Sequence, residues 1–376
     1  MHSFLITNGR VYDPSRHIWE YKDVYIESGK IASSLSADTD HVIDASGCIV
    51  MPGLIDYHVH YYFGGSENGV NPDASSFPCG ITTAVDGGTV GVGGYELYRR
   101  TIVAGAQVRL LNYLLVASGG QSNDRYPENL DPALFDEEKI LRYFEKYRDN
   151  LVAIKTRISN NIISPAQVER SLTRTVEIAE KAGTRVVVHV TDCPVPLDEL
   201  AAMLRPGDVI CHIYQGRGNT CLDADGNVLP GLWKARERGI LFDASNGRSN
   251  YDLEVCRKAV SQGFVPDIIS SDNNTSSWFL QPMHVLPRIL SKYLDFGMDL
   301  AEVLDTATIR PAELIGMPSL ASMAPGTEAD IAIFRLSEKE IPYRDLAGHA
   351  FTGHKVLVPQ MTFKDGQCVY CQADFN

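Results

Sequence analysis

The segment MPGLIDYHVHYY, residues 51–62, is the most informative stretch of this 376-residue chain. It is apolar enough for a buried strand, yet it carries Asp56, His58 and His60 on alternate positions. Side chains alternate between the two faces of a strand, so these three are expected on one face. A single buried histidine is usually a satisfied core residue, but an H-x-H pair at a strand end favours metal binding.

The chain that follows this segment predicts short apolar strands alternating with helices. Eight strands are expected, at Gly53–His60, Ile81–Gly87, Arg109–Ser118, Leu151–Ser159, Arg185–Asp192, Asp208–Tyr214, Ile240–Ser245 and Asp267–Asn273. The helical patterns are clearest at Pro165–Ala182, Gly231–Arg238, Tyr251–Gln262 and Pro282–Leu294. Such alternation is typical of parallel βαβ units, and eight units predict an α/β protein built on a (β/α)8 TIM barrel.

Both ends of the chain have the pattern of antiparallel β structure. The turn signals are Asn8-Gly9 and Ser28-Gly29 near the N-terminus and Asp365-Gly366 near the C-terminus. We therefore expect one small β-sandwich domain made from both chain ends. The predicted boundaries place residues 1–51 and 318–376 in this small domain and residues 52–317 in the barrel.

Composition limits the partners of the protein. A net charge of −13 argues against nucleic acid and anionic membranes. The N-terminal segment lacks the pattern of a signal peptide, and no apolar run has the length of a membrane span. The eight scattered cysteines favour reduced thiols. We expect a cytoplasmic homo-oligomer that acts on a small-molecule substrate.

Ionisable residues recur at the ends of the predicted barrel strands, which is where barrel enzymes carry their active sites. They are His58 and His60 on strand 1, Lys155 on strand 4, His189 on strand 5, His212 on strand 6 and Asp272 on strand 8. One such group in an apolar strand could be structural, but six at matching depth would be costly without a shared partner. The pattern predicts a metal centre.

Lys155 requires a separate argument, because an ammonium group beside a cation site would be repelled. Reaction of the amine with carbon dioxide would give a carbamate, an anionic ligand that can bridge two metals. Two divalent cations against this carbamate, Asp272 and a hydroxide leave a formal charge of about +1, which a buried site tolerates. The alternative is a lysine that reaches the barrel mouth or binds substrate.

The order of these residues resembles that of the amidohydrolase superfamily of binuclear metal hydrolases. MPGLIDYHVH is similar to its entry motif, and MAPGTEADIAIF is similar to its return into the small β domain. The segments ICHIYQGRGN and GILFDASNGRSNYDLEVCRKAVSQGFVPDIISSD resemble the amidohydrolase/deacetylase subgroup. Its members resemble D-aminoacylases and hydrolyse small N- or O-acetyl substrates that bear a carboxylate.

The resemblance implies two divalent metal ions, with zinc expected, and a hydroxide between them that attacks a carbonyl. The implied ligands are His58, His60 and Asp272 for the first ion, His189 and His212 for the second, and the Lys155 carbamate as the bridge. Asp272 would also accept the proton of the water and pass it to the leaving group.

The substrate residues are less clear from the sequence. Arg217 is the first candidate for pairing with a substrate carboxylate, because a guanidinium fork suits that geometry. The other candidates on the same rim are Tyr62, Asn246, Arg248 and Asn273. The subgroup often has Gly-His-Gly where this chain has Ser245-Asn246-Gly247, so Asn246 puts its substrates in doubt. The glycine-rich segment DGGTVGVGG, residues 86–94, is interpreted as a flexible active-site loop.

These observations predict a metal-dependent hydrolase of amide or ester bonds in small carboxylate-bearing acyl substrates, such as N-acyl amino acids or acetyl esters. A dihydroorotase-like cyclic amidohydrolase is the alternative, although Tyr62 stands where a dihydroorotase usually has an arginine. A non-catalytic barrel scaffold is a third hypothesis, and such relatives tend to lose metal ligands. A serine hydrolase is disfavoured because the chain has no GxSxG elbow.

Overall fold

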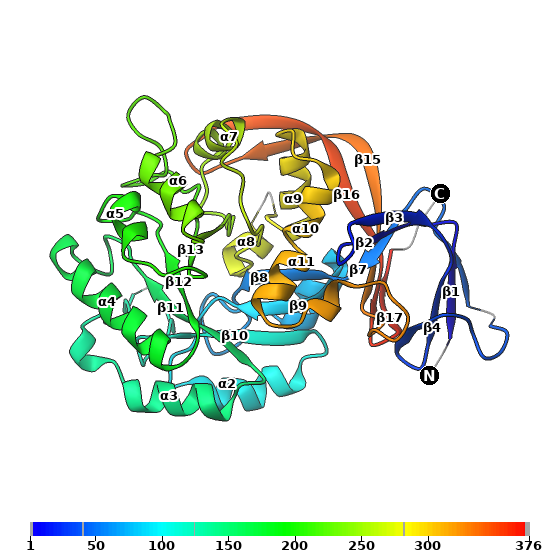
Figure 1. The fold of residues 1–376 in the computed structure, drawn as a ribbon, viewed down its shortest axis with the longest axis horizontal. Coiled ribbons are helices and arrows are strands. Elements are labelled where there is room, and N and C mark those ends of the chain that lie inside the picture. Colours follow the sequence, from blue (N-terminus) through cyan, green and yellow to red (C-terminus); the bar gives the residue numbers. More distant parts are fainter. Residues whose placement is uncertain (1–2, 40, 124, 281–282, 373–376) are drawn as a thin grey trace.

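A curled parallel sheet forms the centre of the protein in the computed structural model, which describes residues 3–39, 41–123, 125–280 and 283–372. Seven strands follow one another around it (Figure 1): β8 (Leu54–Val59), β9 (Ile81–Asp86), β10 (Arg109–Leu115), β11 (Leu151–Arg157), β12 (Arg185–His189), β13 (Val209–Cys211) and β14 (Leu241–Asp243). Each pairs in parallel with its neighbour along the chain. The predicted α/β barrel is confirmed.

The eighth predicted strand is present only as isolated pairing rather than as a regular strand. Ile268 bridges to Asp243 at the end of β14, and Asn273 bridges to Val59 at the end of β8. The amide of Asp272 donates to the carbonyl of His58 at 2.8 Å, which joins this segment to the first strand. Asp272 has a φ of +49°, a conformation that breaks an extended strand. The segment therefore closes the barrel without regular strand geometry.

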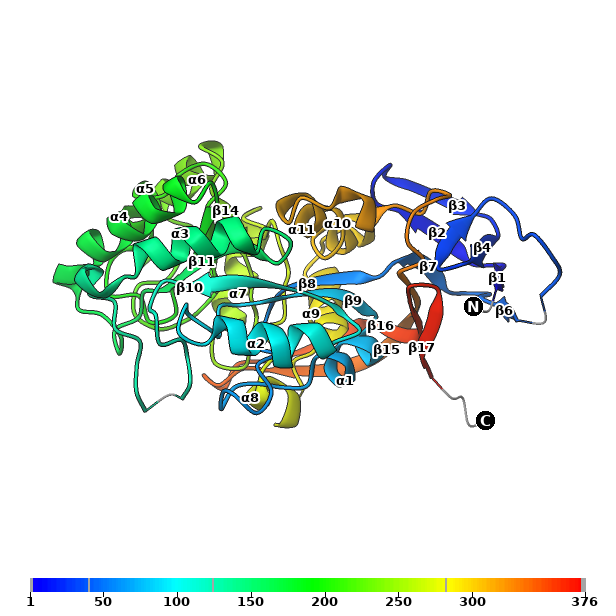
Figure 2. The same ribbon diagram turned by 90° about the horizontal axis from the view of Figure 1, so that it is seen from below.

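Helices connect the barrel strands, and most of them cover the outside of the barrel (Figures 1 and 2). They are α1 (Pro72–Ser76), α2 (Tyr95–Thr101), α3 (Glu137–Lys146), α4 (Pro165–Lys181), α5 (Leu197–Ala202), α6 (Pro230–Glu237), α7 (Leu253–Ser261), α8 (Thr275–Phe279), α9 (Leu286–Asp295), α10 (Leu300–Asp305) and α11 (Ile309–Leu314). Short 3-10 turns lie at Phe77–Cys79, Val103–Gly105, Pro132–Leu134 and Pro318–Ala321.

The best-defined helix signals have clear physical causes. Pro165 opens α4, where its missing N–H costs nothing, and Val168, Leu172 and Ala179 lie buried at helical spacing. The predicted helix at Pro282 begins at Leu286 in the structure, and residue 282 lies outside the described residues. Within the described ranges, no helix is both long enough and apolar enough to span a bilayer.

Strands from both chain ends form the small β part. One sheet has the order β5 (Lys30–Ala32), β4 (Val24–Glu27), β1 (Phe4–Thr7) and β6 (Val42–Asp44). The other has the order β17 (Gln367–Cys371), β16 (Ala350–Lys364), β15 (Ile331–Arg344), β7 (Ile49–Pro52), β2 (Arg10–Asp13) and β3 (Ile18–Tyr21). Their shared apolar core includes Ile6, Val50 and Phe363. The expected small β domain from both ends is confirmed, while its boundaries at residues 51 and 318 stay a prediction.

Two of the three predicted turns join paired strands. Ser28-Gly29 connects β4 to β5, and Asp365-Gly366 connects β16 to β17, each with positive φ at both residues. Such pairs suit a type I′ turn, whose twist matches that of the strands. Asn8 also has a positive φ, but β1 and β2 lie in different sheets, so this turn is a corner between sheets.

The long hairpin of β15 and β16 extends from the small β part along the barrel (Figures 1 and 2). The amide of Leu357 donates to Ser291 Oγ on α9 at 2.9 Å. At the hairpin tip, Asp345 Oδ2 accepts from the amide of Leu253, the first residue of α7, at 2.8 Å. The outer half of this hairpin therefore belongs to the surroundings of the barrel mouth, which the sequence did not indicate.

Candidate active site

Five of the six ionisable residues predicted at the strand ends line one open pocket of about 600 Å³, and His212 lies beside them. His60 Nε2 lies 3.2 Å and His58 Nε2 lies 3.9 Å from Asp272 Oδ1. The ring of His212 is 5.1 Å from that of His58 and 4.3 Å from that of His189, measured between centroids. Lys155 is buried, with its Nζ 3.4 Å from His58 Nε2. The six predicted ligands thus form one continuous cluster.

Three neighbouring strand ends reach this pocket through an unusual backbone conformation. His212, Ser245 and Asp272 have φ values of +64°, +36° and +49°. Residues other than glycine avoid this left-handed region because of steric strain, and the strained positions of proteins concentrate at functional sites. These three residues end three consecutive strand positions of the barrel. Their shared conformation indicates that the fold keeps the strain in order to shape the pocket.

The histidines are oriented through the nitrogen that faces away from the cluster. His58 Nδ1 is 3.0 Å from Ser245 Oγ, and His60 Nδ1 is 2.7 Å from Thr89 Oγ1. His212 Nδ1 donates to the carbonyl of Ser245 at 2.7 Å. Metal-binding histidines are held in this way, because the bond at one nitrogen fixes the ring and directs the other nitrogen toward the metal.

Thr89 and Ser245 are themselves held by buried carboxylates. Asp86 accepts from the amide of Thr89 at 2.7 Å and from its hydroxyl at 3.0 Å. Asp243 accepts from the hydroxyl of Ser245 at 2.6 Å. The sequence analysis missed both hydroxyl residues. Their one sequence signal is their position: Thr89 lies just after predicted strand 2, and Ser245 is the last residue of predicted strand 7.

The glycine-rich segment after β9 is packed against the cluster, which corrects its interpretation as a flexible loop. A Cβ on Gly87 would lie 2.3 Å from His58 Cδ2, and one on Gly88 would lie 2.7 Å from Lys155 Cβ. The segment is buried from Asp86 through Val92. These glycines allow the backbone to approach two predicted ligands closely, which any side chain would prevent.

Burial keeps His58, His189 and His212 neutral. It lowers the pKa of His58 and His189 well below the ordinary value, and the positive charge of Lys155 adds to this effect. Burial also lowers the pKa of His212 to about 4. For Asp272, burial raises the pKa, but the hydrogen bonds with His60 and Asn250 contribute to lowering it overall.

Neutral imidazoles beside one ionised carboxylate are the donor set that zinc and similar divalent ions prefer. Two triads have their donor atoms within 4.8 Å of one another: His58, His60 and Asp272, and His58, Cys211 and His212. The residues present therefore fit a metal centre. Cys211 was not predicted as part of this cluster, and its Sγ accepts from Lys155 Nζ at 3.0 Å.

Two of the predicted substrate residues line the pocket, namely Arg217 and Arg248. Arg217 Nη2 lies 3.5 Å from the carbonyl of Ser249. The structure adds Asn250, whose Nδ2 donates to Asp272 Oδ2 at 2.7 Å, and Arg157, whose guanidinium pairs with Glu128 at 2.7 Å.

The other three predicted substrate residues lie elsewhere. Tyr62 contacts Tyr98 edge to face, with ring centroids 5.0 Å apart. Asn273 is buried behind the pocket, and its carbonyl accepts from the amide of His60 at 2.8 Å. Asn246 faces a neighbouring pocket with His284 and Lys292. Their role in substrate binding stays a prediction.

Fold and site together define a hydrolase-type (β/α)8 barrel with a candidate metal centre at its strand ends. The profile of the amidohydrolase family matches residues 49–369, and the chain belongs to this family. A protein named deacetylase Atu3266 from Agrobacterium fabrum is 28% identical over 342 residues, covering 88% of this chain and 82% of the relative. A deacetylase from Enterococcus faecalis is 25% identical over 90% of this chain and 91% of its own.

The architecture also matches solved structures along its whole length. A structure described as a dihydroorotase superposes with a TM-score of 0.89 at 26% identity, covering 99% of this chain and 98% of the other. One described as an adenine deaminase has the same TM-score at 24% identity, which shows a shared fold alone. The chain is accordingly a hydrolase of the amidohydrolase superfamily.

Proposed function

We propose that this protein is a metal-dependent deacetylase that cleaves amide or ester bonds in small acyl substrates bearing a carboxylate. The observation that carries the proposal is the cluster of histidines and Asp272, in which three imidazoles are oriented through Nδ1 and one carboxylate faces them. The names of the relatives at 25–28% identity support deacetylation as the reaction.

The metal ligands in this proposal are His58, His60 and Asp272 for one ion, His189 and His212 for the other, and Lys155 between them as a carbamate. Two divalent ions, with zinc expected, would acidify a water molecule and polarise the scissile carbonyl when bound.

In this proposal, Asp272 moves the proton. Its Oδ1 faces His60, and its Oδ2 accepts from Asn250 Nδ2, so the carboxylate is fixed in position on both sides. An ionised, fully buried carboxylate can accept a proton at Oδ1 and return it to the leaving nitrogen or oxygen. Asn250 would hold the group still while the proton moves.

Two arginines of the pocket rim would select the substrate. Arg217 and Arg248 line the wall of the pocket in the segments that follow β13 and β14. A guanidinium group binds a carboxylate through two parallel hydrogen bonds, which fixes both the distance and the direction of the substrate. Replacing Arg217 with glutamine is therefore expected to raise KM for carboxylate-bearing substrates more than it lowers kcat.

The function is tested by hydrolysis of N-acetyl-D- and N-acetyl-L-amino acids, acetylated 2-hydroxy acids and cyclic amides with zinc-loaded protein. We expect turnover of an acetylated acid and its loss in Asp272→Asn. Hydrolysis of cyclic amides alone would favour the dihydroorotase-like alternative, for which the structural similarity to a dihydroorotase speaks. Two bound metals with no hydrolysis of any of these substrates would refute the proposal.

The bridge is tested separately with Lys155→Ala. We expect lower metal occupancy and a rate about a thousandfold lower or more, because the two ions lose their shared anionic ligand. Acetate or propionate at high concentration should fit the space of the lost side chain and restore part of the activity. Lys181→Ala, at an exposed lysine, is the matched control. A normal rate with two metals in Lys155→Ala would refute the bridge.

A further inference from the structure

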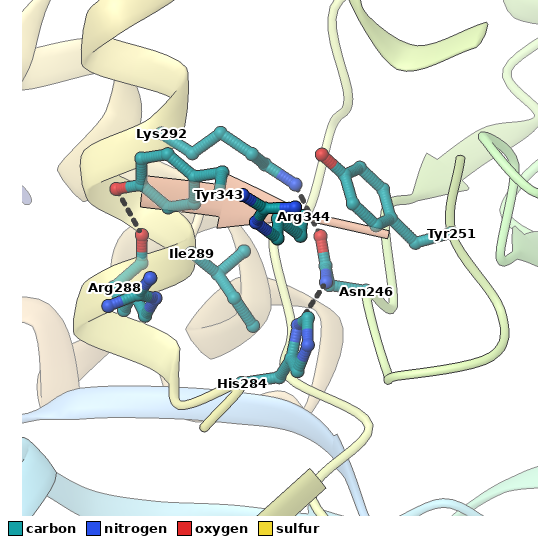
Figure 3. A pocket seen from close by; sticks show the side chains of 8 residues that line it. All are labelled: Asn246, Tyr251, His284, Arg288, Ile289, Lys292, Tyr343 and Arg344. Carbon is teal, nitrogen blue, oxygen red and sulfur yellow. Dashed lines mark hydrogen bonds between the residues drawn. The ribbon is translucent and has the colours of Figure 1, made fainter. Parts of the chain in front are cut away.

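A second, narrow pocket lies beside the metal pocket, and positive charge dominates its lining (Figure 3). Four parts of the chain form it: the segment after β14, the residue His284 before α9, helix α9 itself and the end of β15. The lining residues are Asn246, Tyr251, His284, Arg288, Ile289, Lys292, Tyr343 and Arg344. Three are permanent or predominant cations, and none is acidic.

Lys292 is the buried member of this group, with 2% of its surface exposed. Its ammonium donates to Asn246 Oδ1 and lies 3.6 Å from the centroid of the Tyr251 ring (Figure 3). Within the described residues, no carboxylate forms an ion pair with it. An ammonium buried without a counter-ion costs several kcal/mol, and natural proteins rarely keep one without a use for it.

The nearest acidic group does not serve as that counter-ion. Asp345, on the hairpin tip, accepts from the amide of Leu253 at 2.8 Å and from His349 Nδ1 at 2.9 Å. Its carboxylate is therefore already bonded away from the pocket, to α7 and to its own hairpin. Within the described residues, the positive charge of Lys292 is met by an amide oxygen and by the faces of the Tyr251 and Tyr293 rings.

Two arginines add to the positive field. Arg288 donates to the carbonyl of Pro342 and lies 5.0 Å from the ring of Tyr343, and Arg344 is exposed at the pocket edge. The effect is visible on His284, where burial and then the charges of Lys292, Arg248 and Arg288 lower the pKa to about 4. Burial also lowers the pKa of Lys292 to about 8, so its amine remains mostly charged at neutral pH.

We propose that this pocket binds a small monoanion, a carboxylate group or a halide ion, between Lys292 and Arg344. The pocket has room for about one water-sized group, which suits the charged end of such an ion and excludes a phosphate ester. The bound anion supplies the missing counter-charge of Lys292. Arg344 is the exposed residue of the lining, while His284 and Arg288 are half-buried.

The site is coupled to the metal pocket through Asn246. Lys292 holds the side chain of Asn246, and the two residues beside Asn246 touch predicted metal ligands: Ser245 bonds to His58 and His212, and a Cβ on Gly247 would lie 2.4 Å from Asp272 Oδ2. An anion that draws Lys292 toward itself therefore acts on the segment that orients the metal centre. Anion binding itself does not depend on the proposed deacetylation, so it can be measured without turnover.

The carboxylate has two sources, a free small acid or the substrate itself, and the experiments separate them. The first experiment measures the thermal unfolding temperature of the full chain against sodium formate, acetate or bromide. Sodium methanesulfonate, whose tetrahedral anion is neither a carboxylate nor a halide, holds the ionic strength constant. We expect a saturable rise in the unfolding temperature with the small anions. A rise that does not saturate, or no rise, overturns the proposal.

Variants locate the effect. Lys292→Met keeps the shape of the side chain and removes its charge, while Arg344→Gln changes an exposed residue whose replacement leaves the core intact. We expect each to weaken the apparent anion affinity at least tenfold. Lys258→Met, at an exposed lysine of α7, is the control and should bind as the natural chain does. Unchanged affinity in Arg344→Gln and in any folded Lys292→Met overturns the proposal.

Crystals soaked in sodium bromide identify the site and the source. Anomalous scattering should place a bromide ion in contact with Lys292 Nζ and the Arg344 guanidinium. A second soak adds N-acetylglycine as a carboxylate-bearing analogue. Displacement of the bromide assigns the site to the substrate carboxylate, and its retention assigns the site to a free anion; both outcomes support an anion site. A strong bromide signal elsewhere with none in this pocket overturns it.

Discussion

Replacement of Gly87 by alanine tests whether the close approach of the segment after β9 sets the metal centre. The added Cβ would lie 2.3 Å from His58 Cδ2 and 2.4 Å from its Nε2. Non-bonded carbon atoms rest at about 3.5–4.0 Å, so the imidazole would have to move by roughly 1 Å. Metal–ligand distances tolerate about 0.2 Å, so a shift of this size removes His58 as a ligand.

We expect Gly87→Ala to weaken metal binding by about ten- to a hundredfold and to lower the free energy of unfolding by about 1–3 kcal/mol through overpacking. Metal content after dialysis against a graded chelator series measures the first effect, and urea unfolding of the metal-free protein measures the second. Gly119→Ala is the control, because a Cβ there meets no atom within 4 Å. Natural metal affinity in Gly87→Ala would show that His58 is not held by this contact.

Three further changes test other parts of the structure. Thr89→Val keeps the side-chain shape but removes the hydroxyl 2.7 Å from His60 Nδ1, so metal affinity or kcat/KM should fall by about ten- to a hundredfold; elemental analysis and initial rates check this. Burial lowers the pKa of Lys292 from 10.5 to about 8, so the unfolded chain binds this proton more tightly than the folded protein does. The charged amine therefore destabilises the folded state fully below about pH 8, and this destabilisation disappears as the pH rises toward 10.5. The free energy of unfolding should therefore rise with pH in this window by roughly 2–3 kcal/mol more than in Lys292→Met. Urea titrations at several pH values measure this difference, and the same pH dependence in both proteins would contradict the prediction. The hydrogen bond to Asp345 raises the pKa of His349, so the contact between the charged imidazole and the carboxylate is complete at low pH and is lost as the pH rises through the raised value. Amide exchange at residues 345–350, corrected for intrinsic rates, should therefore accelerate as the pH rises. The acceleration should be smaller in His349→Ala.

The barrel could be predicted because its signals are periodic and repeated. Seven apolar runs became parallel strands within one or a few residues of their expected bounds, and α4 begins at the predicted Pro165. The eighth run forms only isolated bridges to Asp243 and Val59, and its Asp272 has a left-handed conformation. A sequence pattern reports apolar spacing but carries no direct sign of a positive φ on a residue other than glycine.

Part of the candidate site could be predicted because residues that can bind a metal are rare at the ends of apolar strands. His58, Lys155 and Asp272 stand out in apolar surroundings, and the structure brings them together with the other histidines. Thr89 and Ser245 do not stand out, because hydroxyl residues follow many strands. Their roles depend on distances between segments far apart in the chain, and one sequence without structure contains no such distances.

The hairpin of β15 and β16 also determines when the site can be completed during synthesis. Leu346 at its tip lines the metal pocket, and Tyr343 and Arg344 line the neighbouring one. A ribosome makes the barrel strands first, and chains fold from the N-terminus as they emerge. This side of both pockets is therefore made after the barrel strands, and it is in place only when β16 pairs with β15 and lies against α9. A nascent barrel can therefore have all its predicted metal ligands before the hairpin completes the pocket walls. In such a chain, the ligands would be available to a metal before the pocket could select a substrate.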